Sequence, residues 1–290
     1  MTHHARLNLI MFTTIAGLMV FLYFRPQPQG VPEHAISSST VEAVQHLRIV
    51  RQQQDIVLEQ LNGQWHLTEP IQAWADGSKV AEILEILQAT SPQRLPLADL
   101  ARFGLERPNM QLYIDDAYFG FGGFAPTTNL QYVAAGDHVY LLSPRYALAL
   151  PLSPGDLINP ELLAPGEIPV KFELPDVAVE FRNGNWHMTL QQSGDVPDEE
   201  TIRRWVQLWQ TARASKVILS NELNSDFVEA GVMTIGLQDG KTIPLKILQT
   251  DYSIVLLRVN EGIGYQFSAD AGQPLLHPNT LKLEHTVPES

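Results

Sequence analysis

The chain has 290 residues, of which 44% are hydrophobic and 18% charged, a composition that suits about two ordinary domains with a real core. It contains no cysteine, which excludes disulfides, thiolate metal sites and a cysteine nucleophile. The formal net charge of −13 disfavours nucleic acid and anionic lipid headgroups as direct partners.

An uncharged apolar run covers residues 7–24, after a short end of residues 1–6. As an α-helix it would reach roughly 27 Å, about one hydrocarbon core. A cleaved signal peptide would need a small-x-small site next, but the chain continues Arg-Pro-Gln-Pro-Gln-Gly. We therefore expect an uncleaved transmembrane anchor. Arg6 on one flank and Arg25 on the other leave its orientation open. The acidic body favours a single pass through a bacterial inner membrane, with residues 1–6 in the cytoplasm and the body in the periplasm.

Proline and serine dominate residues 25–40, a composition typical of a semi-extended tether. Beyond it we expect module one over residues 41–155, module two over 156–276 and a loose tail over 277–290. The boundary between the modules falls in the proline-rich stretch Pro151–Pro169.

The five-residue motif Asn-Gly-x-Trp-His occurs twice. Its copies begin at Asn62 and Asn183, 121 residues apart. Flanking positions keep the same register, which indicates a tandem of two similar modules. The repeated positions are Asn62, Gly63, Trp65, His66, Asn183, Gly184, Trp186 and His187. Asn-Gly between alternating runs predicts a type I′ hairpin, with the Trp face in the core and the His face in water.

One helix should follow each hairpin and pack on its sheet. Asp76 or Ser78 can begin the first helix, and Pro197-Asp198 the second. Further strands are predicted at Val44–Arg51, Met110–Ile114, Tyr118–Phe121, Gln131–Ala134, His138–Leu142, Val170–Leu174, Met233–Leu237, Thr242–Gln249, Ile254–Val259 and Gly264–Ser268. The fold class is therefore α+β: an N-terminal transmembrane helix, then two modules, each a mainly antiparallel sheet with one packed helix.

Module one resembles a bacterial family known as domain of unknown function 4340. The resemblance follows the order Trp65, Pro70, Ala75-Asp76, the helix, Asp99-Leu100, Phe103-Gly104-Leu105, Pro108, Gly122 and Tyr132-Val133, and spans roughly residues 44–270. It implies a membrane-anchored repeat protein, an accessory of ABC-type transport components related to gliding motility, and supplies no catalytic residues. Module two departs from the pattern at Ala230-Gly231-Val232, so a shared function is expected on module one.

The chemistry-bearing residues form no recognisable catalytic set. His66 and His187 are each expected to face a glutamate across the solvent-exposed side of a hairpin. Such a cross-strand pair stabilises a sheet by about 0.2–1 kcal/mol, and we interpret both histidines as structural. A zinc site shared between the modules is unsupported, and we expect no catalytic, cofactor-binding or metal residues. Trp205 and Trp209 lie on an apolar helix stripe and are predicted to be core, whereas Trp74 is the better candidate for exposure.

The leading expectation is a non-enzymatic periplasmic scaffold that binds another envelope protein, most plausibly ABC transporter subunits. The first alternative is a glycan- or peptide-binding module with a ligand in the cleft between the modules. The residues expected to line that binding surface are Trp74, Tyr118, Phe119, Phe121 and Phe124. The second alternative, an envelope hydrolase, would require a carboxylate pair or a histidine cluster to converge in space.

Overall fold

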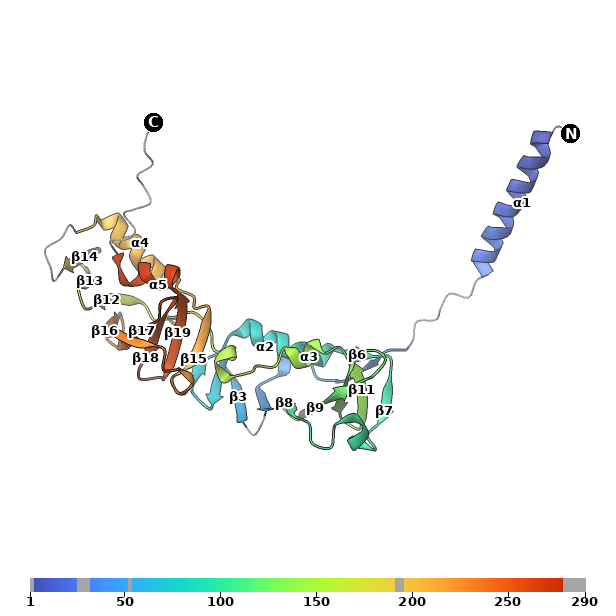
Figure 1. The fold of residues 1–290 in the computed structure, drawn as a ribbon, viewed down its shortest axis with the longest axis horizontal. Helices are drawn as coiled ribbons and strands as arrows, with labels where there is room; N and C mark the ends of the chain where they lie inside the picture. The colour runs from blue at the N-terminus through green and yellow to red at the C-terminus, as the bar shows by residue number, and fades with distance from the viewer. Residues whose placement is uncertain (1–2, 25–31, 52–53, 191–195, 279–290) are drawn as a thin grey trace.

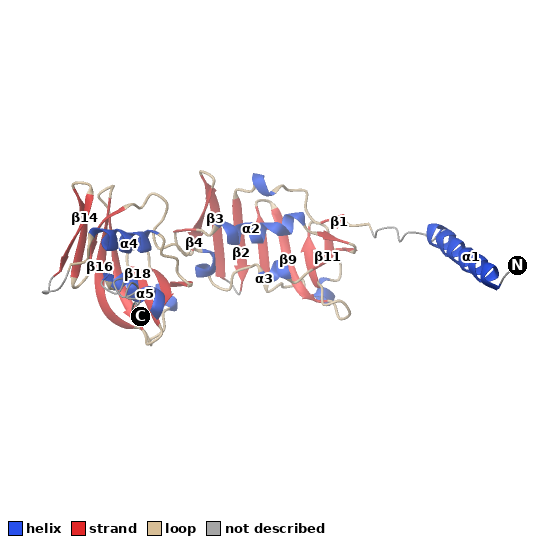
Figure 2. Cartoon of the chain, turned by 90° about the horizontal axis from the view of Figure 1, so that it is seen from above, coloured by secondary structure: helices blue, strands red, loops and turns tan. Residues whose placement is uncertain are grey.

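The computed structural model describes residues 3–24, 32–51, 54–190 and 196–278. These residues form an α+β fold built on two large antiparallel sheets that follow one another along the chain (Figure 1). Helices cover one face of each sheet, as the view from above shows (Figure 2). The arrangement confirms the α+β class expected from the repeat.

Sheet one is formed by β2 (His46–Arg51), β3 (Gln54–Leu61), β4 (Gln64–Glu69), β5 (Ala73–Trp74), β7 (Arg94–Pro96), β8 (Met110–Ile114), β9 (Ala117–Phe124), β10 (Gln131–Ala135) and β11 (His138–Leu142). Within the described residues its order is β5-β4-β3-β2-β8-β9-β10-β11-β7. Two further short strands, β1 (His34–Ala35) and β6 (Thr90–Ser91), pair with each other beside it.

Sheet two is formed by β12 (Pro169–Glu173), β13 (Val177–Arg182), β14 (Asn185–Leu190), β15 (Lys216–Leu219), β16 (Val228–Leu237), β17 (Thr242–Gln249), β18 (Ser253–Arg258) and β19 (Ile263–Ser268). Its order is β14-β13-β12-β16-β17-β18-β19-β15 among the described residues. Apart from the added edge strand β5, this repeats the order of sheet one strand for strand. The topology thus extends the internal repeat well beyond the Asn-Gly-x-Trp-His motif.

The two Asn-Gly turns have the backbone that the hairpin prediction requires. Asn62 and Gly63 have φ angles of 53° and 80°, and Asn183 and Gly184 have 51° and 88°. Positive φ at both central residues is the property of a type I′ turn. The expected pairing of Glu59 with His66 and of Glu180 with His187 is also present. The predicted register of both hairpins is therefore confirmed.

Each sheet carries one main helix on its apolar face. Helix α2 (Gly77–Leu84) begins after Asp76, whose carboxylate accepts a 2.9 Å hydrogen bond from the Ser78 amide. Helix α4 (Glu199–Gln210) begins after Asp198, which accepts a 2.8 Å bond from the Thr201 amide. Such caps satisfy backbone donors that a helix end leaves free. The two capping aspartates occupy equivalent places in the repeat, as the sequence predicted.

The core of module two is built on aromatic rings. Trp205 and Trp209, on α4, are fully buried and lie 5.0 and 5.5 Å from the Phe172 ring of β12. Both indole nitrogens donate 3.1 Å hydrogen bonds to the Leu275 carbonyl in α5 (Ala269–Leu276), a helix that the sequence analysis did not predict. The prediction that these two tryptophans are core residues is confirmed. Phe181 was expected on the same buried face but is 45% exposed, because it lies next to the turn at the end of β13.

The N-terminal helix α1 (His3–Phe24) stands clear of both sheets, and its described side chains are exposed (Figure 1). The expected anchor 7–24 includes residues 7, 8 and 10, whose side chains lie outside the described part. Among the described residues, no helix has the length and apolarity needed to cross a bilayer.

Parts of two expected segments lie outside the described residues, and one expected boundary differs in the structure. Residues 25–31 of the predicted tether and residues 279–290 of the predicted tail lie outside the described residues. The tether was extended too far at its C-terminal end, because His34–Ala35 forms β1 and the Ile36 amide bonds to the Ala89 carbonyl at 3.2 Å. Ile36 is also buried, so this segment belongs to module one.

Candidate functional site

The connector between the sheets, residues 151–168, is hydrogen-bonded to both modules. On the side of module one, the Asp76 amide donates to the Leu157 carbonyl at 2.8 Å and the Asn159 amide to the Trp74 carbonyl at 2.9 Å. On the side of module two, the Ala214 amide donates to the Pro160 carbonyl at 2.8 Å. Backbone bonds of this kind hold the connector in place from both sides.

Arg213 adds charged contacts at the same junction. Its guanidinium lies 3.5 Å from the Asp76 carboxylate of module one and 3.6 Å from the Glu161 carboxylate of the connector. Arg213 is largely exposed, so each of these pairs contributes at most about 1 kcal/mol. The contacts matter more for the position of the capping Asp76 than for overall stability.

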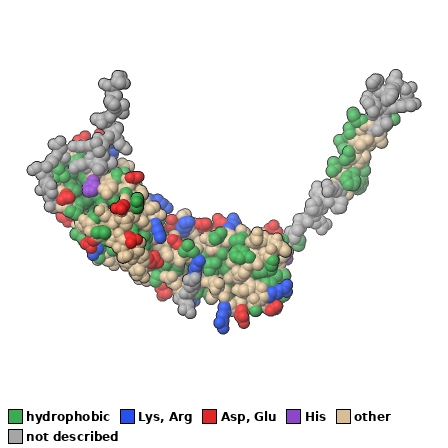
Figure 3. Space-filling model, in the orientation of Figure 1, with side chains coloured by type: hydrophobic (Ala, Val, Ile, Leu, Met, Phe, Trp, Pro, Cys, Tyr) green, Lys and Arg blue, Asp and Glu red, His purple; other side chains and the backbone are tan. Residues whose placement is uncertain are grey.

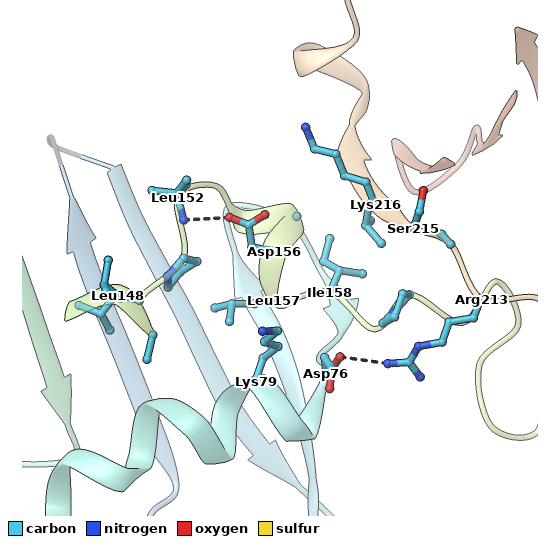
Figure 4. A pocket seen from close by; sticks show the side chains of 17 residues that line it. Asp76, Lys79, Leu148, Leu152, Asp156, Leu157, Ile158, Arg213, Ser215 and Lys216 are labelled. Carbon is cyan, nitrogen blue, oxygen red and sulfur yellow. Dashed lines mark hydrogen bonds and ion pairs between the residues drawn. The ribbon is translucent and has the colours of Figure 1, made fainter. Parts of the chain in front are cut away.

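A hollow of about 470 Å³ opens at this junction, and we name it the partner groove (Figure 4). The start of α2, the end of α3 (Arg145–Leu148), the connector and β15 contribute its walls. Its floor includes the short turn Pro154–Leu157, where the Asp156 carboxylate accepts from the Leu152 and Ser153 amides at 2.8 and 2.9 Å. The groove thus exists only when both modules and the connector are in place.

Two leucines on the wall of the partner groove are unusually exposed. Leu148 is 82% exposed and Leu152 75% exposed, on either side of the Pro151 backbone. Neither side chain has a place in the core, although each is large enough to contribute about 2 kcal/mol if it were covered. Exposed apolar side chains that gather beside a groove often mark a site for another protein.

Three cations share the groove with these leucines, namely Lys79, Arg213 and Lys216. Figure 3 shows Lys and Arg side chains near the junction of the two modules. Lys216 has no ion pair with any other described residue, whereas Lys79 is paired with Glu82 and Arg213 with Asp76 and Glu161. The groove's acids are engaged with backbone amides or with Arg213. In a chain of net charge −13, this combination makes the groove locally suited to an anionic, apolar segment.

Gly155 sets the distance between the connector and β15. A Cβ at this position would lie 2.5 Å from the Val217 carbonyl oxygen, so an alanine must push the two backbones apart. We expect Gly155→Ala to lower the free energy of unfolding by about 1–3 kcal/mol, the usual cost of overpacking a tight contact. Urea unfolding followed by circular dichroism measures this change.

Gly77→Ala is the matched control for the Gly155 variant. Gly77 stands at the start of α2 with nothing within 4 Å of its Cβ position. Alanine there is expected to be neutral or to stabilise the protein by up to about 1 kcal/mol, because it restricts the unfolded chain. Equal unfolding midpoints for the two variants would show that the Gly155 contact does not set the junction.

A second hollow, of about 270 Å³, also lies between the modules, and we name it the Trp74 cleft. Strands β4 and β5 supply His66 and Trp74, the connector supplies Asn159 and Glu161, and the region of β18 and β19 supplies its remaining wall. Trp74 is half-buried and its backbone is held by Asn159. The sequence-based expectation that Trp74 keeps an accessible surface agrees with this position.

Arg258 is a buried cation at the base of the Trp74 cleft. Its guanidinium donates to both oxygens of Glu167, at 2.6 and 3.0 Å, and to the Leu162 carbonyl at 3.0 Å, and it lies 2.6 Å from Glu261. The Arg258 side chain is only 7% exposed. Since Glu167 and Leu162 belong to the connector, this cluster joins the connector to sheet two.

Two residues near Arg258, Glu261 and Tyr265, have raised pKa values. Burial raises the pKa of Glu261, and the Arg258 charge opposes that rise. Burial raises the pKa of Tyr265 to about 12, so its hydroxyl stays neutral at physiological pH. Partial burial of carboxylates beside a single cation leaves the Trp74 cleft weakly anionic.

The other aromatic residues expected on a binding surface do not gather around Trp74. Phe119 and Phe121 are 1% and 3% exposed and belong to the core, so they cannot line a ligand cleft as expected. Tyr118 packs in a small cluster on the opposite face of sheet one, 5.2 Å from the Tyr113 ring. Phe124 is 59% exposed, at the end of β9. The alternation of side chains along β9 separates these residues.

The repeated histidines occupy different surroundings. His66 lies on the wall of the Trp74 cleft, with its Nδ1 3.2 Å from the Gln64 carbonyl oxygen. His187 is exposed opposite Glu180, whose carboxylate is hydrogen-bonded to Arg182 and has its pKa lowered by that bond. Trp65 is buried, whereas Trp186 is half-buried against Phe181. Among the described residues, no three His, Cys, Asp or Glu side chains gather closely enough to hold a metal ion.

Sequence reasoning missed both the exposed leucines and Arg258. Leu148 and Leu152 fall in the run Ala-Leu-Ala-Leu-Pro-Leu, which carries no pattern that separates buried from exposed positions. Arg258 could have been noticed, because it follows four apolar residues of β18 at an inward position of the strand. A charged side chain at such a position requires partners, which here come from distant parts of the chain.

Comparison with known families gives one match. A family model described as Domain of unknown function (DUF4340) matches residues 65–231, more than half of the chain. The matched segment runs from β4 of sheet one to β16 of sheet two, and is shorter than the span of about 44–270 expected from the sequence. No curated protein and no solved structure matches the chain.

Proposed function

Since the chain belongs to the DUF4340 family, a domain of unknown function, we propose from its own geometry that it is a non-enzymatic accessory protein of the bacterial envelope. It would be held at the inner membrane by residues 7–24, with both modules in the periplasm. Its role would be to bind another envelope protein, namely the membrane subunits of an ABC-type transport system. The uncharged run in α1 supports the anchor.

The observation that carries the proposal is the partner groove. Leu148 and Leu152 offer apolar surface that the fold leaves uncovered, and Lys79, Arg213 and Lys216 line the same groove. The occupant that fits is a protein segment with apolar side chains beside a carboxylate. Burying the two leucines would favour binding by about 25 cal/mol per Å² of apolar area, while the cations would select the acidic segment.

The rigid junction supports a scaffold rather than two independent modules. The connector is hydrogen-bonded on both sides and Arg258 fixes its far end. A partner that contacts both walls of the groove therefore meets a surface that is already arranged, which reduces the entropic cost of binding.

The test is site-specific photo-crosslinking of the full-length protein in cells. A photo-reactive amino acid is placed at Leu148, at Leu152 or at Tyr252, which is 84% exposed and does not line the groove. We expect one membrane transport subunit to be captured from the two groove positions and not from Tyr252. The product should disappear when Leu148→Asp is added to the Leu152 probe.

The control separates the body from the anchor. A chain that keeps residues 1–33 but lacks both modules should recover none of the same subunit. Capture from Tyr252 equal to that from Leu148, or an unchanged product in the Leu148→Asp variant, would contradict the proposed groove. Turnover of an envelope substrate that one point mutation abolishes would contradict the non-enzymatic role.

A further inference from the structure

The Trp74 cleft brings an aromatic side chain and polar groups together from three separate segments. Trp74 comes from β5, Asn159 and Glu161 from the connector, and Glu261 from the turn between β18 and β19. Its volume of about 270 Å³ lies near the lower limit of small-molecule sites, which run from about 300 to 1,000 Å³. The space suits a ligand of about one ring.

Arg258 lines this cleft and gathers acceptors from the chain itself. Both terminal nitrogens are occupied by Glu167, Glu261 and the Leu162 carbonyl. The remaining donor, Nε, is buried and has no hydrogen-bond partner in the part of the chain that the structure describes. The Nε atom is closed off from the solvent, so a ligand in the cleft meets the carboxylates around Arg258 and not this donor.

The charges of the lining select against several kinds of ligand. Glu167 and Glu261 share the single cation Arg258, and Glu161 is paired with Arg213. The excess negative charge repels phosphates and carboxylates. An apolar ligand would take water away from the partly exposed Glu261 carboxylate and would give the side-chain amide of Asn159 no hydrogen bond, both of which are costly.

A hydroxylated ring satisfies these requirements together. Its hydroxyls can donate to Glu261 and accept from the side-chain amide of Asn159, because each hydroxyl is both a donor and an acceptor. Its apolar ring face can cover the exposed part of the Trp74 indole. We propose that the Trp74 cleft binds one uncharged sugar ring, supplied either by an envelope polysaccharide or as a free sugar. This site is separate from the partner groove and does not depend on the proposed partner.

The test is direct titration of the full-length protein in a zwitterionic detergent, since sugar-based detergents would compete for the site. The probes are N-acetylglucosamine and glucose, with glucuronate as the anionic comparison and spermidine as the cationic one. Tryptophan fluorescence and isothermal titration calorimetry report binding. We expect saturable binding of at least one neutral sugar at millimolar concentration, and none of glucuronate. Co-sedimentation with purified peptidoglycan then distinguishes the polymer from the free sugar as the source.

Three variants test whether the sugar binds in the Trp74 cleft. Trp74→Ala is expected to weaken sugar binding about tenfold through lost stacking. Glu261→Gln keeps the size of the side chain and should also weaken binding about tenfold, through one lost charge-assisted hydrogen bond. Phe124→Ala removes an exposed aromatic ring elsewhere and should bind as the unmodified protein does.

The outcomes that overturn the proposal are equally definite. Absence of saturable binding for both neutral sugars and for peptidoglycan would refute it. Binding of spermidine in place of the sugars would assign the cleft to amines instead. Sugar binding that survives both Trp74→Ala and Glu261→Gln would place the sugar elsewhere on the protein. If Trp74→Ala does not fold, as judged by circular dichroism, the Glu261→Gln variant alone decides the question.

Discussion

Replacement of Trp205 by alanine is expected to lower the free energy of unfolding by about 3–5 kcal/mol, the range for deleting a large core aromatic. Trp205 is fully buried, and its ring lies 5.0 Å from Phe172 and 6.0 Å from Trp209. Its Nε1 also donates to the Pro274 and Leu275 carbonyls, at 3.1 Å each. The variant therefore leaves a cavity and removes one of the bonds that hold α5 against α4.

Two variants on the same helix test whether that loss comes from the core. Trp205→Phe keeps most of the ring volume but not the indole donor, so it should lose less than Trp205→Ala. Leu208→Ala changes a side chain that is 37% exposed and should stay within about 0.5 kcal/mol of the unmodified protein. Urea unfolding measured by tryptophan fluorescence compares all three. A loss below about 1 kcal/mol for Trp205→Ala would contradict the packing described for α4.

Replacement of Arg258 by methionine is expected to cost about 3–5 kcal/mol near neutral pH, as is usual when one partner of a buried charge cluster is removed. Methionine keeps the apolar length of the side chain but leaves Glu167 and Glu261 without their cation. The connector would also lose the bond from Arg258 to the Leu162 carbonyl. Unfolding in urea at about pH 8 measures the effect.

The pH dependence of the Arg258 variant has a definite sign. Burial already raises the pKa of Glu261, and loss of the cation would raise it further. A carboxyl whose folded pKa is raised contributes stability at low pH, and this contribution is lost as pH rises through the folded pKa. The deficit of Arg258→Met should therefore be smaller at about pH 5 than at about pH 8.

The triple variant Arg258→Met, Glu167→Gln, Glu261→Gln is the matched control. It removes all three charges and should recover part of the stability lost by Arg258→Met, because no carboxylate is left without a cation. If Arg258→Met shows the same deficit at both pH values, and the triple variant recovers nothing, the loss arises from packing alone.

Local sequence patterns predicted most of the regular structure. The Asn62-Gly63 and Asn183-Gly184 turns set their hairpins because few other residue pairs adopt positive φ twice in succession. Asp76 and Asp198 begin their helices as expected, since a helix start is a local event. By contrast, β5, β15 and α5 were missed. Strand β5 has only 2 residues, whereas β15 and α5 depend on bonds to remote segments, β19 and α4.

The sequence predicted the candidate sites less well than it predicted the fold. Trp74 was identified because it stands just before a helix and outside an apolar stripe. Phe119 and Phe121 were assigned to the surface although the pleat of β9 directs them into the core. When both faces of a strand carry aromatic residues, the spacing of those residues in the sequence does not show which face packs against the core.

The sequence by itself determined the repeat, the hairpin turns, the helix starts and the cysteine-free, acidic character of the body, because each depends on neighbouring residues or on composition. Only the tertiary structure decided that the connector bonds to both modules, that Arg258 meets Glu167 and Glu261, and that Leu148 and Leu152 remain uncovered. These features join residues up to about a hundred positions apart. Such contacts follow from how the two sheets pack, which no local pattern specifies.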